Sequence, residues 1–288
     1  MNRAPIPLQT RLDLDRSELE ICVLASGSKG NSLVLRTHQG CLLVDAGLSA
    51  RELLRRLSMV GVPATDLAGV LLSHAHSDHS SGLGVLCRKL GLPVFTSAGT
   101  QSACARHLTG HGRLHTIRAG QPFQVLGLDI LPFAVSHDCR EPLMFRVEAG
   151  QTRLAIATDL GVADPGVSRH LHGLDLLVLE SNHDLERLLA GPYPWQLKQR
   201  VRGPRGHLSN RQAAELLCEV LGPRLKHVIL GHLSDTNNTP ALALETVRSL
   251  LRERGLVQPE LRVAAQSEPG EWLRPGADRL PASKQANS

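Results

Sequence analysis

The sequence lacks the features that mark membrane and secreted proteins. No run of about 18 uncharged apolar residues occurs among its 288 residues, which excludes an ordinary membrane-spanning helix. The N-terminal segment also lacks the apolar core of a secretion signal. Together, these absences favour a cytoplasmic protein that does not contact a membrane.

Paired cysteines are missing as well. No two of the six cysteines are separated by two residues, and most lie within apolar segments. They are Cys22, Cys41, Cys87, Cys104, Cys139 and Cys218. This distribution indicates reduced core thiols rather than a disulfide framework or a cysteine-ligated zinc site.

The composition is otherwise that of a globular protein. Apolar residues make up 42% of the chain, which is enough for a sizeable core. The net charge of +5 and the isoelectric point near 9.1 would suit a polyanionic partner, although so modest an excess is common among soluble proteins. Neither composition nor spacing indicates an oligomeric state.

Apolar runs and turn residues predict short strands alternating with helices. Strands are expected over residues 19–25, 32–37, 40–47, 68–73, 93–97, 123–137, 143–150, 152–161, 174–181, 227–232 and 260–266. Helices are expected over residues 49–61, 81–91, 100–108, 211–222 and 240–255, with Ser209 and Gln212 as a capping box before the fourth. Residues 182–210 have no clear period, so an irregular basic segment is predicted there.

These elements predict one α/β domain over residues 20–266, with sheets inside and helices outside. Residues 1–19 would form an N-terminal extension. Residues 267–288 are rich in proline, glycine and charge, and a disordered tail is therefore expected.

A cluster of metal-binding residue types follows the strand expected at residues 68–73. In "HAHSDH", His74 and His76 alternate on an extended segment and can face one metal ion. The turn after them can direct Asp78 and His79 toward a second ion. The alternative is that the four residues cap or line an ordinary loop, but four constrained positions make that interpretation weaker.

Further ligand types stand at the ends of other predicted strands. His137, Asp159 and His232 each close an apolar run. Asp45 closes another, ahead of Gly47. Asp45 is either a turn former or the acceptor that orients a ligating histidine.

The motifs resemble the signature of a known superfamily. "HAHSDH", with "VDAG" before it and "SH", "TD" and "GH" after it, is similar to the five motifs of the metallo-β-lactamase fold hydrolases. The resemblance implies an αββα sandwich, in which two mixed β-sheets are flanked by helices, with a dinuclear site at one edge. It also implies one ion held by His74, His76 and His137, a second held by Asp78, His79 and His232, and Asp159 between them.

Departures from two branches of the superfamily narrow the resemblance. Class B1 β-lactamases have arginine in place of His79 and cysteine in place of Asp159, so hydrolysis of antibiotics is not expected. The span between Asp159 and His232 is also too short for the extra domain of β-CASP nucleases.

A narrower resemblance rests on five more motifs. "LASGSKGNS", "ESNHD", "GPYPWQLKQR", "GHLSN" and "GHLSDTNN" are similar to those of the YycJ/WalJ family. This resemblance implies a DNA exonuclease of the 5′-to-3′ type. Two divalent ions, Zn, Mn or Fe, would lower the pKa of a shared water to about 7 and would neutralise charge on a phosphate. Asp159 would position the resulting hydroxide.

Three other segments are candidates for substrate contact. In the glycine-rich loop, Ser28, Lys29 and Asn31 could cradle a phosphate, with Gly27 and Gly30 permitting positive φ, or the loop could be a simple hairpin turn.

The second candidate is the basic segment, in which no acid occurs between residues 187 and 215. Lys198, Arg200 and Arg202 accompany Tyr193 and Trp195 there, as a nucleic-acid groove requires. A solvated basic loop is the ordinary alternative.

The third candidate is a pair of histidines. His183 and His207 could contact a phosphate or protonate the leaving oxygen, or they could be packing and capping residues. Glu180, at a strand end beside them, could orient one of them.

Three functions remain open from the sequence. The first is a metal-dependent DNA phosphodiesterase, and the second is a hydrolase of a small ester, thioester, lactone or cyclic phosphodiester at the same site. The third is a metal-stabilised nucleic-acid-binding protein without catalysis. A pocket lined by the basic segment would favour nucleic acid, and a narrow apolar pocket would favour a small substrate.

Overall fold

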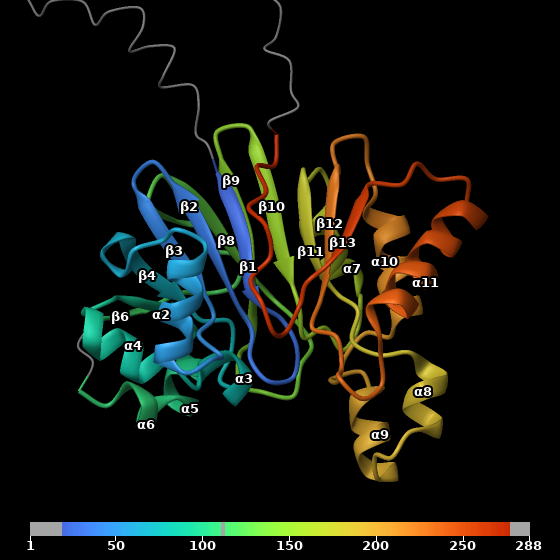
Figure 1. Cartoon of the computed structure of the whole chain (residues 1–288), viewed down its shortest axis with the longest axis horizontal. Coiled ribbons are helices and arrows are strands. Elements are labelled where there is room, and N and C mark those ends of the chain that lie inside the picture. The colour runs from blue at the N-terminus through green and yellow to red at the C-terminus, as the bar shows by residue number, and fades with distance from the viewer. Residues whose placement is uncertain (1–18, 111–112, 277–288) are drawn as a thin grey trace, which may run out of the picture.

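Two β-sheets packed face to face form the centre of the protein in a computed structural model that describes residues 19–110 and 113–276 (Figure 1). The first sheet has the order β1-β2-β3-β4-β5-β6. Its strands are β1 (Glu20–Ala25), β2 (Ser32–Thr37), β3 (Gly40–Val44), β4 (Leu67–Leu71), β5 (Val94–Thr96) and β6 (Leu114–Thr116). The first three strands are antiparallel, and the pairs from β3 to β6 are parallel.

The second sheet has the order β13-β12-β11-β10-β9-β8-β7. Its strands are β7 (Phe123–Val125), β8 (Leu128–Ala134), β9 (Leu143–Ala149), β10 (Thr152–Ala157), β11 (Leu176–Glu180), β12 (His227–Gly231) and β13 (Glu260–Val263). The pairs from β7 to β10 are antiparallel, and the pairs from β10 to β13 are parallel. Both sheets are therefore mixed.

Helices cover the outer face of each sheet, which completes four layers (Figure 1). On the first sheet these include α2 (Ala50–Met59), α4 (Leu83–Leu90), α5 (Ala98–Ala103) and α6 (Ala105–Leu108), and a short 3-10 helix spans Ala64–Asp66. On the second sheet they are α7 (Pro165–Leu171), α10 (Asn210–Val220) and α11 (Pro240–Glu253). The αββα sandwich predicted from the sequence is confirmed.

Side chains alternate between the two faces of each strand, which explains how the layers pack together. In β1, Ile21 and Val23 point into the core between the sheets, whereas Cys22 and Leu24 pack under α2 and α4. Because both faces are covered, the strands read as continuous apolar runs in the sequence. All six cysteines are free thiols, as expected.

Two predictions about irregular segments were wrong. Residues 182–210 contain two short helices, α8 (Leu185–Ala190) and α9 (Trp195–Val201), which project from the body of the protein (Figure 1). Residues 267–276, expected in a disordered tail, pack along β1, where Leu273 pairs with Ile21 and the Trp272 indole donates to the Val60 carbonyl. Two large apolar side chains supply this packing within an otherwise polar segment. Residues 277–288 and 1–18 lie outside the described residues.

Other elements had no prediction. They include α7, β6 and the single helical turn α3 (Ser77–Ser80). The capping box of Ser209 and Gln212 is present at the start of α10, as predicted. Among the described residues, no helix combines the length and the apolar character that crossing a membrane requires.

Candidate metal centre

Polar side chains from both sheets meet at one edge of the sandwich, where strands of the two sheets end. They lie at or just after the ends of β3, β4, β8, β10, β11 and β12, and they are Asp45, His74, His76, Asp78, His79, His137, Asp159, Glu180 and His232. A cavity of about 360 Å³ opens among them, lined also by residues of the α9 segment. Chain segments more than 150 residues apart in sequence therefore build one site.

The α3 turn positions the residues of the "HAHSDH" motif. His76 precedes the turn, while Asp78 and His79 lie within it, so they leave the strand in a different direction from His74. The loop after β3 runs against this turn at Gly47, whose added Cβ would lie 1.7 Å from the Asp78 carbonyl oxygen. Only glycine permits this close approach.

Three site residues have left-handed backbone conformations. The φ angles are +60° at Asp45, +55° at Asp159 and +56° at His232. Each residue lies one or two positions after a strand, so the positive φ turns its side chain into the site instead of along the sheet. Such conformations cost non-glycine residues about 1–3 kcal/mol and concentrate at functional sites.

One group of imidazoles converges on a common point. The Nδ1 atom of His76 lies 3.2 Å from Nε2 of His74 and 3.2 Å from Nε2 of His137. Three ring nitrogens at these separations cannot all carry protons directed at one another. A cation between them would be bound by three lone pairs.

A second group lies beside the first. Asp78 Oδ2 is 3.3 Å from His232 Nε2 and 3.5 Å from His79 Nε2. Asp159 stands between the groups, with Oδ2 at 3.2 Å from His79 Nε2 and Oδ1 at 3.6 Å from His137 Nε2. The structure thus brings together the seven residues predicted as ligands.

The opposite ring nitrogen of four of these histidines is held by an acceptor. His79 Nδ1 donates to Asp45 Oδ2 and His232 Nδ1 to Glu180 Oε1. Separately, His74 Nδ1 contacts Ser73 Oγ, and His137 Nδ1 contacts the carbonyl of Gly206. These partners fix which nitrogen of each ring keeps its proton, so that the ion-facing nitrogen is the one that can offer a lone pair to a cation.

Burial and charge set the protonation of the site. Burial lowers the pKa of His74 and of His137, which keeps both imidazoles neutral. Burial would raise the pKa of Asp159, but the neighbouring charges of His232 and His79 outweigh it and hold that pKa well below its usual range. Burial would lower the pKa of His232, but Asp159 and Asp78 raise it to about 10. A cation that binds to the second group therefore displaces protons.

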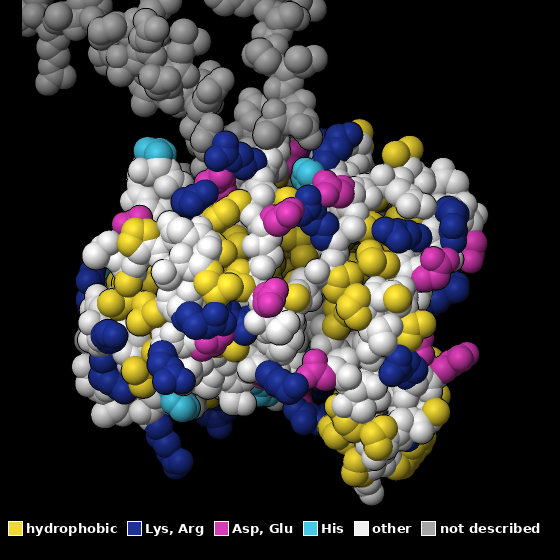
Figure 2. Space-filling model, viewed as in Figure 1, with side chains coloured by type: hydrophobic (Ala, Val, Ile, Leu, Met, Phe, Trp, Pro, Cys, Tyr) yellow, Lys and Arg dark blue, Asp and Glu magenta, His cyan; other side chains and the backbone are white. Residues whose placement is uncertain are grey.

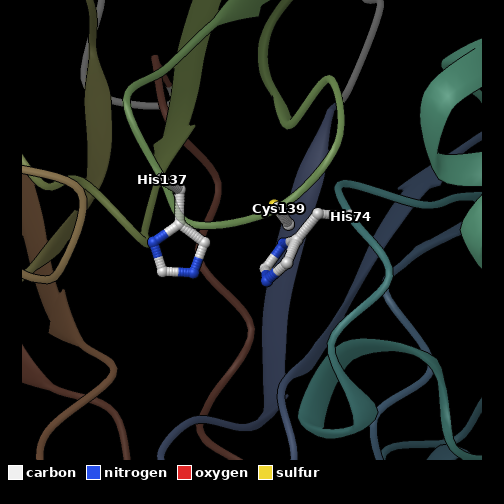
Figure 3. A group of neighbouring side chains, drawn as sticks. All are labelled: His74, His137 and Cys139. Carbon is white, nitrogen blue, oxygen red and sulfur yellow. The ribbon is translucent and has the colours of Figure 1, made fainter. Parts of the chain in front are cut away.

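A thiol lies nearer to the first group than the sequence suggested. Figure 3 shows Cys139 beside His74, with His137 on the same loop as Cys139, and ligand atoms of the three residues lie within 4.8 Å of one another. Burial raises the pKa of Cys139 to about 12, with Asp159 and Asp138 adding to the shift. The thiol is therefore neutral, and imidazoles and carboxylates dominate the donor set.

The residues fit a divalent metal. Oδ2 of Asp159 is buried and makes no hydrogen bond among the described residues, although Nε2 of His79 lies 3.2 Å away, so this carboxylate oxygen is incompletely satisfied. A cation between Asp159 and the converging nitrogens would satisfy this oxygen. Nitrogen and oxygen donors of this kind suit Zn, Mn or Fe.

The glycine-rich loop contributes in a different way from the prediction. Gly27 and Gly30 have φ angles of +145° and +148°, as expected for glycine positions. Ser28 lines the cavity, but Lys29 is exposed and pairs with Asp235 at 2.7 Å. Asn31 is buried and donates to Asp78 Oδ2 at 3.2 Å, so it supports a carboxylate of the site and does not line the cavity.

The basic residues of α9 separate into two kinds. Arg200 lines the cavity and donates to Asp138. Lys198 instead donates to the Leu189 carbonyl, and the Arg202 guanidinium lies over the Trp195 ring at 5.3 Å. Neither Lys198 nor Arg202 is among the residues that line the cavity.

The two candidate histidines also differ. His207 lines the cavity, and its Nδ1 donates to Glu180 Oε1 at 2.9 Å, which leaves Nε2 available to a ligand. His183 is buried and absent from the cavity lining, and burial lowers its pKa to about 4. Glu180, proposed to orient one histidine, contacts both His207 and His232.

Sequence reasoning missed Asp138, Cys139 and Ser73 as members of the site. Asp138 directly follows His137, and Ser73 directly precedes His74. Their position next to a predicted ligand was the only feature of the sequence that could have identified them. That signal does not tell which side of the chain faces the site.

Comparisons with known proteins agree with this geometry. A family model described as a beta-lactamase superfamily domain matches residues 41–233. The chain is 38% identical to "Exodeoxyribonuclease YycJ" of Bacillus anthracis over 240 residues, which cover 82% of this chain and 90% of that protein. It is 37% identical to "Exodeoxyribonuclease WalJ" of Streptococcus pneumoniae over 238 residues, covering 81% and 88%. The crystal structure of the metallo-beta-lactamase fold protein YhfI from Bacillus subtilis superposes with a TM-score of 0.66 at 16% identity, covering 88% and 99%.

Proposed function

Because this chain belongs to the β-lactamase superfamily and, within it, to the family of the YycJ and WalJ exodeoxyribonucleases, we propose that it is a metal-dependent hydrolase that releases nucleotides from DNA ends. One observation carries the proposal: the two groups of ligand-type atoms meet in a single cavity that also contains an arginine. A phosphate there would meet both the ions and a guanidinium.

Seven residues would hold the ions. The first ion would be bound by His74, His76 and His137, the second by Asp78, His79 and His232, and Asp159 would contact both. When bound, two divalent ions supply an activated water near neutral pH and neutralise charge on a phosphate. Asp45 and Glu180 would keep His79 and His232 in the tautomers that this binding requires.

His207 is the proposed proton-handling group. Glu180 accepts from its Nδ1, so Nε2 is the atom that can contact a phosphate oxygen or protonate the leaving oxygen. The structure gives His183 no access to the cavity, and we therefore propose His207 alone for this role.

The α8–α9 projection is the proposed substrate-binding element. It carries the exposed apolar side chains of Leu185, Leu189 and Trp195, and Figure 2 shows apolar side chains gathered over it. Trp195 is 53% exposed, with Arg202 over its ring, so a base could stack there while Arg200 neutralises a backbone phosphate at the cavity.

The test is digestion of duplex DNA labelled at either end, by protein loaded with Zn or Mn. Wild-type protein should shorten the strand stepwise from its 5′ end, and His76→Ala and Asp159→Asn should not. A generic phosphodiester serves as the small-substrate control. Intact DNA with cleavage of the small ester would reject the polymer substrate. Binding of DNA without cleavage of either substrate, under several metals, would reject catalysis.

A further inference from the structure

One ligand-type histidine has no hydrogen-bonded acceptor on its outer nitrogen. Four of the five imidazoles have such a partner, but Nε2 of His76 instead lies 3.5 Å from Oδ1 of Asp138. The same oxygen is 3.5 Å from Nε2 of His137, but that nitrogen faces the first ion, which leaves His76 Nε2 as the donor for Oδ1. This Oδ1 atom is buried and has no hydrogen-bond partner among the described residues. A shift of a few tenths of an ångström would close the bond.

The other oxygen of Asp138 faces the projecting helix. Asp138 Oδ2 accepts a charge-assisted hydrogen bond from Nε of Arg200, a residue of α9 whose side chain is 59% exposed. Among the described residues, the guanidinium of Arg200 has no other hydrogen-bond partner, and its terminal amino groups therefore remain available at the cavity that it lines. One carboxylate therefore stands between an ion-facing imidazole and an arginine of the α8–α9 projection.

We propose that Asp138 is a positioning residue that couples the first ion to α9. Its Oδ1 accepts from His76 Nε2, which directs the lone pair of Nδ1 toward the ion. Its Oδ2 fixes Arg200, which orients the remaining guanidinium donors toward a phosphate. Binding of the ion fixes His76, and through Asp138 it restrains Arg200 and the last turn of α9. This inference rests on the proposed function of the site.

The first experiment is calorimetric titration of metal-free protein with Mn²⁺. Asp138→Asn should weaken the binding of one ion by about 10- to 100-fold, as changes in groups that orient metal ligands do. Asp235→Asn is the matched control, since it neutralises an exposed acid that pairs with Lys29 and faces no ligand histidine. Wild-type affinity in Asp138→Asn would overturn the proposal.

The second experiment follows amide hydrogen exchange of α9 by mass spectrometry, with and without Mn²⁺. The ion should slow exchange over residues 195–201 in the wild type and in Asp235→Asn, but not in Asp138→Asn. Arg200→Gln should also abolish this protection without weakening ion binding, which keeps the test decisive if Asp138→Asn does not fold. Protection that persists in either variant would overturn the coupling.

Neither readout uses DNA. Wild-type protein that binds Mn²⁺ with protection of α9, yet never cleaves DNA, would reject the proposed function and leave the role of Asp138 intact. Cleavage of DNA by wild-type protein in which the ion does not protect α9 would reject the role of Asp138 and leave the proposed function intact.

Discussion

Glu180 is the residue on which the two sides of the cavity depend. It is fully buried, and it accepts from His207, from His232 and from the backbone amides of Asp159, Leu160 and Leu208. Burial would raise its pKa, but the charges of His207 and His232 lower it to about 2. A full negative charge is thereby kept where it polarises two imidazoles at once.

Replacement of Glu180 by glutamine should therefore impair metal binding and catalysis together. We expect metal affinity and kcat to fall by about 10- to 100-fold each, because one amide cannot accept from both rings as strongly as a carboxylate. Titration with Mn²⁺ and single-turnover digestion measure the two effects. Glu245→Gln, on the exposed face of α11, is the control. If Glu180→Gln had the same metal affinity and kcat as this control, the proposed role of Glu180 would be wrong.

Prediction from sequence could place residues whose type and strand-end position are recognisable. His74, Asp159 and His232 were predicted at the site in this way and lie together there, and Asp45 contacts a histidine, which is one of its two predicted roles. It failed where a residue's role depends on its neighbours in space. Asn31 has the type expected of a substrate donor, yet it supports Asp78, because only the fold determines which atoms its amide meets.

Among the elements, the contact between the β3–α2 loop and α3 sets the spacing of the site. Gly47→Ala places a methyl group against the Asp78 carbonyl, so we expect weaker metal binding and a lower free energy of unfolding. Gly61→Ala is the matched control, since its φ is +75° but nothing lies within 4 Å of an added Cβ. That variant should lose only about 1–2 kcal/mol of stability and no metal affinity. Equal metal affinity in the two variants would contradict this account.

The α8–α9 projection should govern the affinity for DNA. In an Asp159→Asn background, which prevents digestion, Arg200→Gln should weaken binding and reduce the slope of log K against log salt by about 0.7–0.9, the value for one phosphate contact. Trp195→Ala should weaken the binding of single strands and change the slope little. Fluorescence anisotropy over a salt series measures both. Arg252→Gln on α11 is the control. An unchanged slope in Arg200→Gln would show that Arg200 does not contact a phosphate.

Neither α8 nor α9 was predictable by periodicity. Each has only six or seven residues, which is too short for an apolar stripe to repeat, and α9 has no buried residue. The longer helices α10 and α11 bury one face against the second sheet, and their predicted ranges match the structure within two residues.

The segment after β13 returns to the first strand and joins the two ends of the described chain. Glu20 of β1 pairs with Arg274 of this segment and with Arg36 of β2, while Arg36 lies 3.8 Å from the centre of the Trp272 ring. Burial would raise the pKa of Glu20, but the two arginines outweigh it and lower that pKa below its usual range. The composition of residues 267–276 gave no sign of these contacts, since they depend on partners more than 200 residues away.

The sign of this shift predicts a pH dependence of stability. Because the pKa of Glu20 is lower in the folded state, its stabilisation is complete above about pH 4.3 and is lost as the pH falls further. Glu20→Gln should lower the free energy of unfolding by about 1 kcal/mol at pH 7 and much less at pH 3. Urea unfolding of the two proteins at pH 7 and at pH 3 measures this difference in free energy. An equal difference at the two pH values would show that it does not come from the ion pairs of Glu20.

Two ions should act together at the edge of the sandwich to cleave DNA. The most direct measurement titrates metal-free protein with Mn²⁺ while recording, in the same samples, the ions bound per chain and the rate of nucleotide release. We predict that release begins only as the second ion binds, and that Asp159→Asn releases nothing at any loading. Full activity with one ion per chain, or two bound ions without release, would contradict the account.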